Sequence, residues 1–526
     1  MDSRFQSSST PDKKEAYCIG IDVGTSGIRT LLIDGQGECL DRDMLTYEEI
    51  RAQGITIWDS EKRADATKIF STILARLEVI QADFPDCRIR AIGISCFHPS
   101  LVCLDPDGKP LGLATTYAYQ GAATYLNQLP PDFQASTGAM ISMAIPYVQL
   151  RQIQQESPDL HPAKIVPLAD YLVWSMTDLG LEKSFVGRPT ASYSGLYSVD
   201  THTWHEGRLQ EVGLKTSQMP AIRELGTMYA VSADLQAHFP ILQGARVAIG
   251  GYDGLDAFWA VGVNQGDKVI VGSASTSGAL RRWNTGSIKD LKSPLIYCNH
   301  VQGDDWVVVL PFNNVGTSLH WLAGKFKLWS WSEYLTPEGL LDLDRLDLEA
   351  EQRLDDLSES AGEYLSKLPL YFPYIEGEPR GPGGRGSQVK GGLIGRQTGH
   401  DAIDLYIALI LGIVNMYKHV LNNLDTPQDY QEIRLTGLVA RKCPLFCHFL
   451  ATASNCQVKI MVNEQSVAWV AGLRALQSVG QIDSLPQVGT LEPFKPLGGL
   501  EKQALDELFG RYLDVYEYWE RIEIEG

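Results

Sequence analysis

The feature that most constrains the fold is a short pattern that occurs twice, about 250 residues apart. Residues 16–34, AYCIGIDVGTSGIRTLLID, consist of an apolar run, a turn of small residues and a second apolar run. The same pattern returns at residues 267–283, DKVIVGSASTSGALRRW. Two apolar runs joined by a Gly/Thr/Ser turn predict a β-hairpin. The repetition predicts two α/β halves, and a cleft between domains is a favoured ligand site.

The length of the chain agrees with two domains. Single hydrophobic cores stop growing at roughly 250 to 300 residues, and this chain has 526. We place the boundary near Gly244, which gives domains at 16–244 and 245–526. Residues 1–15, MDSRFQSSSTPDKKE, are rich in Ser and Lys and lack the apolar core of a secretory signal, so we expect a disordered tail.

Strand and helix patterns mix along both halves. Helical spacing covers 60–77 after a cap at Asp59, and 166–176 looks like a strand that runs into a helix. The long apolar face of 401–422 predicts a buried helix, and a short strand at 433–435 leads into a helix at 444–454. The sequence therefore predicts an α/β fold throughout.

Charge and cysteine usage limit the partners. The net charge of -19 disfavours nucleic acid or an anionic membrane as a partner. The longest apolar stretch, 405–417, is shorter than the 18 or so residues of a membrane span. Nine cysteines without a CxxC pair favour reduced thiols in the cytoplasm. We expect a cytoplasmic protein with a small-molecule ligand, and a homodimer is left open.

The two hairpin turns are candidate phosphate sites. Turns of Gly, Thr and Ser expose backbone N–H groups and add hydroxyl donors, which suits an anion. A plain hairpin turn is the alternative for either one alone, but the pair favours phosphate. Asp22 ends an apolar strand, is costly to bury unpaired and would suit a hydrated Mg²⁺; Arg29 could add positive charge. The turn residues are Gly24, Thr25 and Ser26 in the first hairpin and Thr276, Ser277 and Gly278 in the second.

A third motif supplies a candidate base. In residues 247–259, VAIGGYDGLDAFW, an apolar strand delivers Asp253 between glycines and ahead of a helical pattern. A carboxylate there could accept the proton of a hydroxyl that attacks a phosphoryl group. Two alternatives stay open: Asp253 merely caps the helix, or Asp256, one turn later, is the base.

Taken in order, these motifs resemble a known family. IGIDVGTSGIR, GGYDGLDAFWAVG, GSASTSG, NNVGTSLHW, HDAIDLYIALILG and RLTGLVARKCPLFCHFLATASNCQV followed by EQSVAWVAG occur as they do in FGGY carbohydrate kinases, and most resemble the xylulokinase and gluconokinase branch. The resemblance implies two ribonuclease H-like domains of the actin, hexokinase and Hsp70 ATPase type with an interdomain cleft. It also implies ATP and Mg²⁺ as cofactors.

The resemblance carries over to single residues. Asp22 matches the aspartate for metal and phosphate, Asp253 matches the catalytic base, and Phe97-His98 matches a Met-His pair that meets the sugar. An imidazole can hydrogen-bond a hydroxyl, although a packing histidine is the alternative. On the nucleotide side the matching residues are Thr25 and Ser26 in the first phosphate loop, Gly316 as the glycine that closes on the nucleotide, and Gly437 and Ala440 in the adenosine motif.

Several positions depart from the family pattern. Where the family has a Gly-Gly-Gly-Ala run against the adenine, this chain has GLVA at residues 437–440. Trp469 and Ser275 also replace glycines of the family pattern. These larger side chains predict a narrower nucleotide pocket. The family's Trp-x-Asp-x-Arg stretch is replaced by YAYQG at residues 117–121. Thr190 stands where the family has an aspartate.

We therefore expect ATP-dependent phosphorylation of a small sugar, sugar acid or polyol, such as xylulose, ribulose or gluconate, with Asp253 as the base. A degenerate sugar-binding regulator and an actin-like assembly protein are the alternatives.

Overall fold

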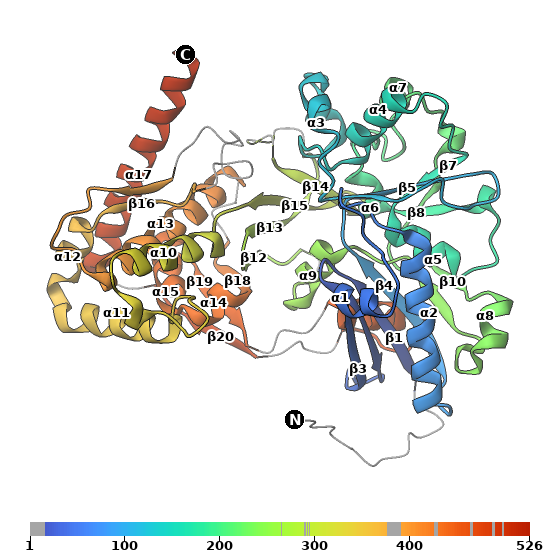
Figure 1. Ribbon diagram of the computed structural model, residues 1–526, viewed down its shortest axis with the longest axis horizontal. Helices are drawn as coiled ribbons and strands as arrows, with labels where there is room; N and C mark the ends of the chain where they lie inside the picture. Colours follow the sequence, from blue (N-terminus) through green and yellow to red (C-terminus); the bar gives the residue numbers. More distant parts are fainter. Residues whose placement is uncertain are drawn as a thin grey trace. The chain divides into compact units, whose positions relative to one another are not determined.

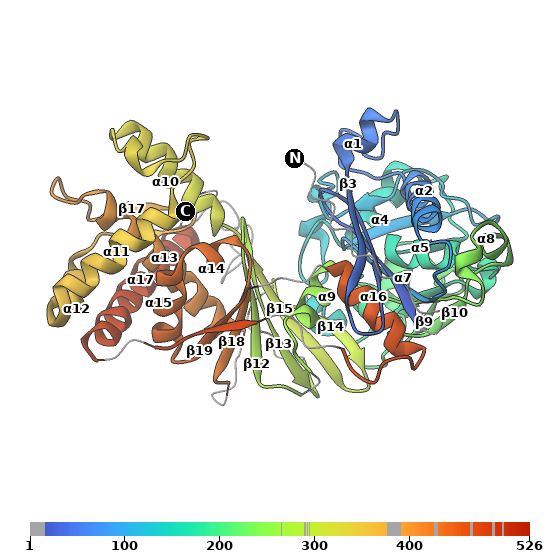
Figure 2. The ribbon, with the colours of Figure 1, turned by 90° about the horizontal axis from the view of Figure 1, so that it is seen from below.

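The computed structural model divides into two compact α/β units (Figures 1 and 2). It describes residues 16–264, 266–288, 291, 293, 295–375, 391–424, 430–462, 467–485, 490–496 and 499–525. The first unit is Met1–Gly262, Asn299–Asp304 and Gln465–Val488; the second is Val263–Cys298, Asp305–Glu464 and Gly489–Gly526. The boundary between the units falls after Gly262, whereas the sequence placed it near Gly244. Asp253 therefore belongs to the first unit. The expected tail, 1–15, lies outside the described residues.

A six-stranded mixed sheet forms the centre of the first unit. Its order is β10-β11-β4-β1-β2-β3. The predicted first hairpin is confirmed, because β1 runs antiparallel to β2, and β1 also pairs in parallel with β4. The bounds are β1 Tyr17–Val23, β2 Gly27–Ile33, β3 Cys39–Thr46, β4 Ile89–Cys96, β10 Met228–Ala230 and β11 Arg246–Ala248.

Helices cover both faces of this sheet (Figure 2). The apolar side chains of α2 (Ala66–Asp83) and α5 (Leu168–Ser175) join the core on one face. On the other face α16 (Val467–Ser478) lies against β1 and β4 and beside α9 (Asp253–Ala260). The contact with α16 is close, since a Cβ added at Gly20 would lie 1.8 Å from the Ala468 carbonyl oxygen.

The first long helix begins later than the spacing predicts. Asp65 is its N-cap and accepts from the backbone N–H groups of Thr67 and Lys68. Asp59, the predicted cap, accepts instead from the N–H groups of Glu61 and Arg63 within a turn. Asp is equally suited to both roles, so the residue type alone could not locate the first turn. The predicted strand-to-helix passage at 166–176 is confirmed by β7 (Lys164–Val166) and α5.

The remainder of the first unit consists of shorter elements. They form a three-stranded sheet of order β6-β5-β7 and a β8–β9 pair. The bounds are β5 Ser100–Leu104, β6 Thr115–Thr116, β7 Lys164–Val166, β8 Phe185–Gly187, β9 Ala221–Arg223, α1 Tyr47–Ala52, α3 Phe133–Thr137, α4 Pro146–Glu156, α6 Arg188–Ser192, α7 Glu206–Glu211 and α8 Ala233–His238.

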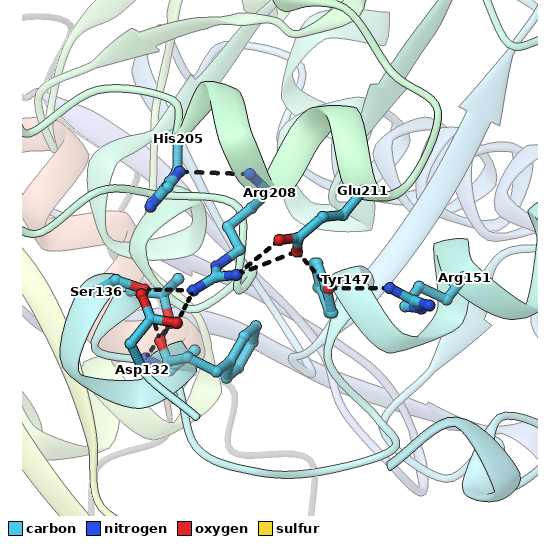
Figure 3. Close-up of polar contacts among 10 residues, drawn as sticks. Asp132, Ser136, Tyr147, Arg151, His205, Arg208 and Glu211 are labelled. Atoms are coloured by element: carbon cyan, nitrogen blue, oxygen red, sulfur yellow. Dashed lines mark hydrogen bonds and ion pairs between the residues drawn. The ribbon is translucent and has the colours of Figure 1, made fainter. Parts of the chain in front are cut away.

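A buried arginine, Arg208, lies where three of these helices pack against one another (Figure 3). Arg208 on α7 forms ion pairs with Asp132 at 2.6 Å and with Glu211 at 2.9 Å, and its guanidinium lies 5.8 Å from the Phe133 ring centre. Glu211 also accepts from the Tyr147 hydroxyl of α4 at 2.6 Å. Because both acids and an aromatic face converge on one guanidinium, Arg208 stabilises the packing of α3, α4 and α7.

A seven-stranded mixed sheet of order β14-β15-β13-β12-β18-β19-β20 contains the main strands of the second unit, although residues 299–302 of β14 are grouped with the first unit. The second predicted hairpin is confirmed, because β12 and β13 pair antiparallel. The predicted strand at 433–435 is β18, and the helix at 444–454 is α15. The strands are β12 Val269–Ala274, β13 Gly278–Thr285, β14 Tyr297–Gln302, β15 Asp305–Phe312, β18 Glu432–Thr436, β19 Gln457–Met461 and β20 Leu491–Phe494, with β16 Leu370–Phe372 and β17 Gly392–Ile394 as a separate pair.

The helices of this unit pack around α13 (Ala402–Asn423). Asp401 caps α13, as the predicted start at 401 requires, and accepts from the N–H group of Asp404. Although α13 is long and apolar enough to cross a membrane, 89% of its most apolar window is buried inside the protein, so it is a core helix. The other helices are α10 Gly316–Leu328, α11 Leu343–Leu357, α12 Ala361–Lys367, α14 Leu438–Lys442, α15 Pro444–Ser454 and α17 Gly499–Glu525.

Candidate active site

The turn between β1 and β2 exposes hydrogen-bonding groups. The N–H group of Gly24 donates to the Gly27 carbonyl at 2.9 Å, which closes the turn. Thr25 and Ser26 are exposed at its tip. The Tyr47 hydroxyl donates to the Gly24 carbonyl at 2.9 Å and fixes the turn from outside. The turn thus presents two hydroxyl donors to solvent from a braced backbone.

Asp22 lies beside this turn at the end of β1. It pairs with Arg29 across the β1–β2 ladder. Burial raises the pKa of Asp22 to about 6, while the positive charge of Arg29 lowers it. One carboxylate oxygen, Oδ1, is buried and has no hydrogen-bond partner among the described residues. A buried, unpaired carboxylate oxygen fits a hydrated Mg²⁺.

Asp253 is the first residue of α9. The helix N-cap is Tyr252, and the Asp253 carboxylate accepts from the adjacent Gly254 N–H at 2.7 Å. Its negative charge acts on neighbours in the same unit: after burial, it is a cause of the raised pKa of Cys96 and of Tyr117. The carboxylate therefore lies close to the end of β4 and to the 117–121 stretch.

His98 lies among aromatic rings, one of which belongs to Tyr252, the residue before Asp253. Its ring is 4.9 Å from Tyr193 and 5.0 Å from Tyr252, centre to centre. Both ring nitrogens are buried without a hydrogen-bond partner among the described residues, and burial lowers the pKa of His98 to about 3. The imidazole is thus neutral at physiological pH, with one donor and one acceptor nitrogen.

Phe97 has a different environment from its neighbour. It is 1% exposed and packs against Trp58 at 5.3 Å and Tyr117 at 5.7 Å, so it forms part of the core behind the pocket. Sequence reasoning did not identify Tyr193 and Tyr252 as the neighbours of His98. Tyr252 stands next to Asp253 in the GGYDG motif, which was an available signal, whereas nothing in the sequence places Tyr193 beside His98.

Asp170 anchors α6, the short helix that directly precedes Tyr193. It is 2% exposed, and its carboxylate accepts from the Gly187 N–H and the Thr190 hydroxyl, both at 2.8 Å. Thr190, which stands where the family has an aspartate, therefore serves as a donor to a buried carboxylate. Burial raises the pKa of Asp170 to about 7, and these hydrogen bonds oppose the shift.

This shift predicts a pH dependence of stability. The folded protein binds the Asp170 proton more tightly than the unfolded chain, whose pKa is near 3.8. The stabilisation is therefore complete below about pH 4 and is lost as the pH rises through about 7, with a slope of up to ~1.4 kcal/mol per pH unit. In Asp170→Asn this part of the slope should disappear. Urea unfolding of both proteins across pH 5 to 8 measures it, and parallel slopes would contradict the assignment.

The second hairpin turn borders a cavity inside the second unit. The Gly316 N–H at the start of α10 donates to the carbonyls of Ser275 at 2.8 Å and Thr276 at 3.1 Å, which joins the helix to the turn. The cavity has a volume of about 380 Å³. It is lined by Ser275, Thr276, Gly316, Leu319, His320, Thr336, Glu338, Leu340, Leu341, Asp342, Leu343, Asp344, Leu438, Val439 and Lys442.

The structure brings together some of the predicted nucleotide residues. Thr276 and Gly316 line the cavity, but Ala440 is fully buried behind it. Gly437 has φ of +103°, and a Cβ there would lie 2.4 Å from the Ala274 carbonyl oxygen, so this glycine is required where α14 meets the turn. Ser277 and Gly278 complete the turn and the start of β13.

Of the residues expected to narrow the nucleotide pocket, Ser275, Leu438 and Val439 line this cavity and Trp469 does not. Trp469 belongs to the first unit, where its indole N–H donates to the Gly37 carbonyl at 2.7 Å, and it is not among the lining residues. Leu438 and Val439 do line the cavity, and Leu438 is 53% exposed. Sequence reasoning missed the part of the lining that comes from residues 336–344, because no local motif marks it.

The two units thus present a carboxylate and histidine pocket in one and a cavity beside a hydroxyl-rich turn in the other, which are features of a phosphotransferase. Two family models match this chain: the N-terminal domain of the FGGY family of carbohydrate kinases over residues 17–259, and its C-terminal domain over residues 287–477. The chain belongs to the FGGY family of carbohydrate kinases. It is therefore an ATP-binding transferase.

Relatives across the family share its whole length at low identity. A gluconokinase of Bacillus licheniformis is 23% identical over 488 residues, which cover 90% of each chain. A xylulose kinase of Staphylococcus epidermidis is 22% identical over 513 residues, which cover 95% of each. Among solved structures, a ligand-bound xylulose kinase from Lactobacillus acidophilus matches with a TM-score of 0.80 at 19% identity, covering 96% of this chain and 98% of that one. Plasmodium falciparum glycerol kinase with ADP matches with a TM-score of 0.74 at 14% identity, covering 95% and 98%.

Proposed function

We propose that this carbohydrate kinase transfers the γ-phosphoryl group of ATP to a hydroxyl of a small sugar or polyol held by His98, with Asp253 as the general base. The observation that carries the proposal is the pair of buried His98 nitrogens without a partner among the described residues, in a ring that contacts Tyr252, the residue before Asp253. Buried polar atoms are normally hydrogen-bonded, and a substrate hydroxyl on each side of the ring would satisfy them.

Asp253 suits the role of base by its position. A base must reach the proton of the attacking hydroxyl directly or through one water. Asp253 stands at the first position of α9, immediately after Tyr252, whose ring contacts His98. A hydroxyl bound at His98 would lie beside this carboxylate, which takes up its proton as the oxygen attacks phosphorus.

The phosphates of ATP would be bound by Asp22, Arg29 and the two hairpin turns. Mg²⁺, held through water by Asp22, would supply positive charge against the charge that develops during phosphoryl transfer. The hydroxyls of Thr25, Ser26 and Thr276 are exposed at the two turns and can donate to phosphate oxygens. The apolar lining beside the second turn, formed by Leu319, Leu341 and Val439, suits the flat face of a nucleotide base.

The charge around His98 favours a neutral substrate over a sugar acid. After burial, the largest cause of the raised pKa of the nearby Cys96 thiol is the negative charge of Asp253. A hexonate would have to place a carboxylate in this field, at a Coulomb cost. We therefore infer a neutral ketose or polyol, such as a xylulose- or ribulose-like sugar, rather than gluconate.

The experiment is ADP release by the purified protein with Mg-ATP and a panel of pentuloses, pentitols, glycerol and hexonates. The proposal expects turnover with a neutral member of the panel. Turnover with a hexonate alone would overturn the inferred charge preference. Absence of turnover, with one sugar raising the Tm, would support the alternative of a sugar-binding regulator, in which Leu438 and Val439 obstruct the nucleotide.

Replacement of His98 should weaken sugar binding specifically. His98→Phe keeps an aromatic ring between Tyr193 and Tyr252 but removes both polar nitrogens, so we expect the KM for the sugar to rise roughly 10- to 100-fold. The KM for ATP should change less than about twofold, which serves as the internal control. Because the pKa of His98 is about 3, the sugar KM of the native protein should be constant between about pH 6 and pH 8. A histidine that only packs would leave the sugar KM unchanged in the variant.

A further inference from the structure

A second carboxylate, Asp256, lies one helical turn after Asp253 on α9. Its side chain is 1% exposed, and Oδ2 has no hydrogen-bond partner among the described residues. Burial raises the pKa of Asp256 to about 6. A buried carboxyl group is costly, so the contacts around it indicate its role.

Groups from three other elements face Asp256. Arg474 on α16 lowers its pKa by positive charge, and the Ser95 hydroxyl on β4 lowers it too without forming a hydrogen bond of normal geometry. The negative charge of Asp22 on β1 raises it. Asp256 also packs beneath the loop before Asp253, since a Cβ added at Gly251 would lie 3.0 Å from Asp256 Oδ1. Its environment is therefore the interior behind the site, where a sugar hydroxyl has no access.

Arg474 contacts α9 through Trp259 and lies near Asp256. Its guanidinium lies 4.6 Å from the ring centre of Trp259, a cation–π contact, and it borders the same cavity of about 10 Å³ as Asp256. Burial lowers the pKa of Arg474, and the charge of Asp256 opposes that shift. One side chain of α16 thus packs on Trp259 and lies across a small cavity from Asp256 of the same helix.

The helix that carries Arg474 is itself fixed on the sheet. A Cβ added at Gly93 on β4 would lie 1.9 Å from the Ala471 carbonyl oxygen, so the backbones of β4 and α16 are in direct contact. This contact stands one turn from Arg474. The sheet therefore supports α16, and α16 supports α9 through Arg474.

From this arrangement we propose that Asp256 and Arg474 act together as positioning residues, which hold the first turn of α9 so that the Asp253 carboxylate points into the sugar pocket. The inference rests on the proposed role of Asp253 as the base. It also favours Asp253 over Asp256 as the base, because Asp256 is 1% exposed and packs beneath the loop that precedes Asp253.

The test compares Asp256→Asn, Arg474→Gln and the double variant in the full-length protein with the accepted sugar and Mg-ATP. We expect kcat per folded molecule to fall at least about tenfold in each single variant, since small displacements of a reacting group are costly. The KM values for sugar and ATP should stay within about twofold. The double variant should lose about as much as either single one, because the two residues act as one unit.

Arg208→Gln is the matched control. Arg208 is also a buried arginine of the first unit with carboxylate partners and an aromatic contact (Figure 3), so its loss should lower the Tm and leave kcat per folded molecule unchanged. Native kcat in Asp256→Asn, or losses that multiply in the double variant, would overturn the positioning role and leave Asp253 as the base. Native kcat in Asp253→Asn would instead overturn the proposed function, and this inference with it.

Discussion

Asp253→Asn should lower kcat by about 10³-fold, the middle of the range for loss of a general base. The amide keeps the size of the carboxylate and can still accept from the Gly254 N–H, so the fold and both KM values should change little. The expected loss is in the chemical step, since the amide cannot take up the proton of the attacking hydroxyl. Steady-state ADP release with saturating sugar and ATP measures it.

Asp256→Asn is the matched comparison for this prediction, because it makes the same change on the same helix one turn away. Its smaller expected loss, on the order of tenfold, reflects positioning rather than proton transfer. If Asp256→Asn proved the more damaging of the two, the assignment of the base to Asp253 would be wrong.

Gly93→Ala should be the most destabilising of the substitutions considered. The new Cβ would lie 1.9 Å from the Ala471 carbonyl oxygen and 3.0 Å from the Gly472 nitrogen, and both are backbone atoms that cannot rotate away. Helix α16 would have to shift from β4, at a cost of about 3 kcal/mol. We expect the Tm to fall by roughly 6 to 12 °C, and kcat to fall as well, because α16 carries Arg474.

The control for Gly93→Ala is Gly324→Ala on α10. A Cβ at Gly324 would have no heavy atom within 4 Å outside its own chain neighbours and the backbone of its helix. Alanine is the better helix former, so this change should be neutral or stabilising by up to about 1 kcal/mol. Equal Tm values for the native protein and Gly93→Ala in thermal unfolding would contradict the close packing of α16.

The sequence was most informative where a local pattern determines the structure. Both hairpins and the extent of α13, predicted at 401–422, followed from apolar periodicity and turn residues. The start of α2 did not, because Asp59 and Asp65 are equally good caps and only the tertiary packing selects Asp65. The compact division after Gly262 likewise depends on long-range contacts, since α16 returns to the first unit from far along the chain.

For the candidate site, the sequence located polar residues that follow strands and missed their neighbours. Asp22 and Asp253 stand in recognisable motifs, but the contact of Tyr193 with His98 joins segments almost 100 residues apart. Trp469 was expected at the nucleotide pocket because of its place in a motif, yet its indole N–H donates to the Gly37 carbonyl, and both residues belong to the first unit. Such errors arise where the chain crosses between units, which no local pattern reports.

The central claim is that the chain phosphorylates a small neutral sugar or polyol with ATP. The most direct test is ³¹P NMR of a reaction that contains the protein, Mg-ATP and the sugar selected by ADP release. The account predicts a new sugar phosphate resonance that grows in equal amount with ADP and is absent with Asp253→Asn over the same time. ADP formation that is accompanied only by inorganic phosphate, at the same rate with and without sugar, would contradict it.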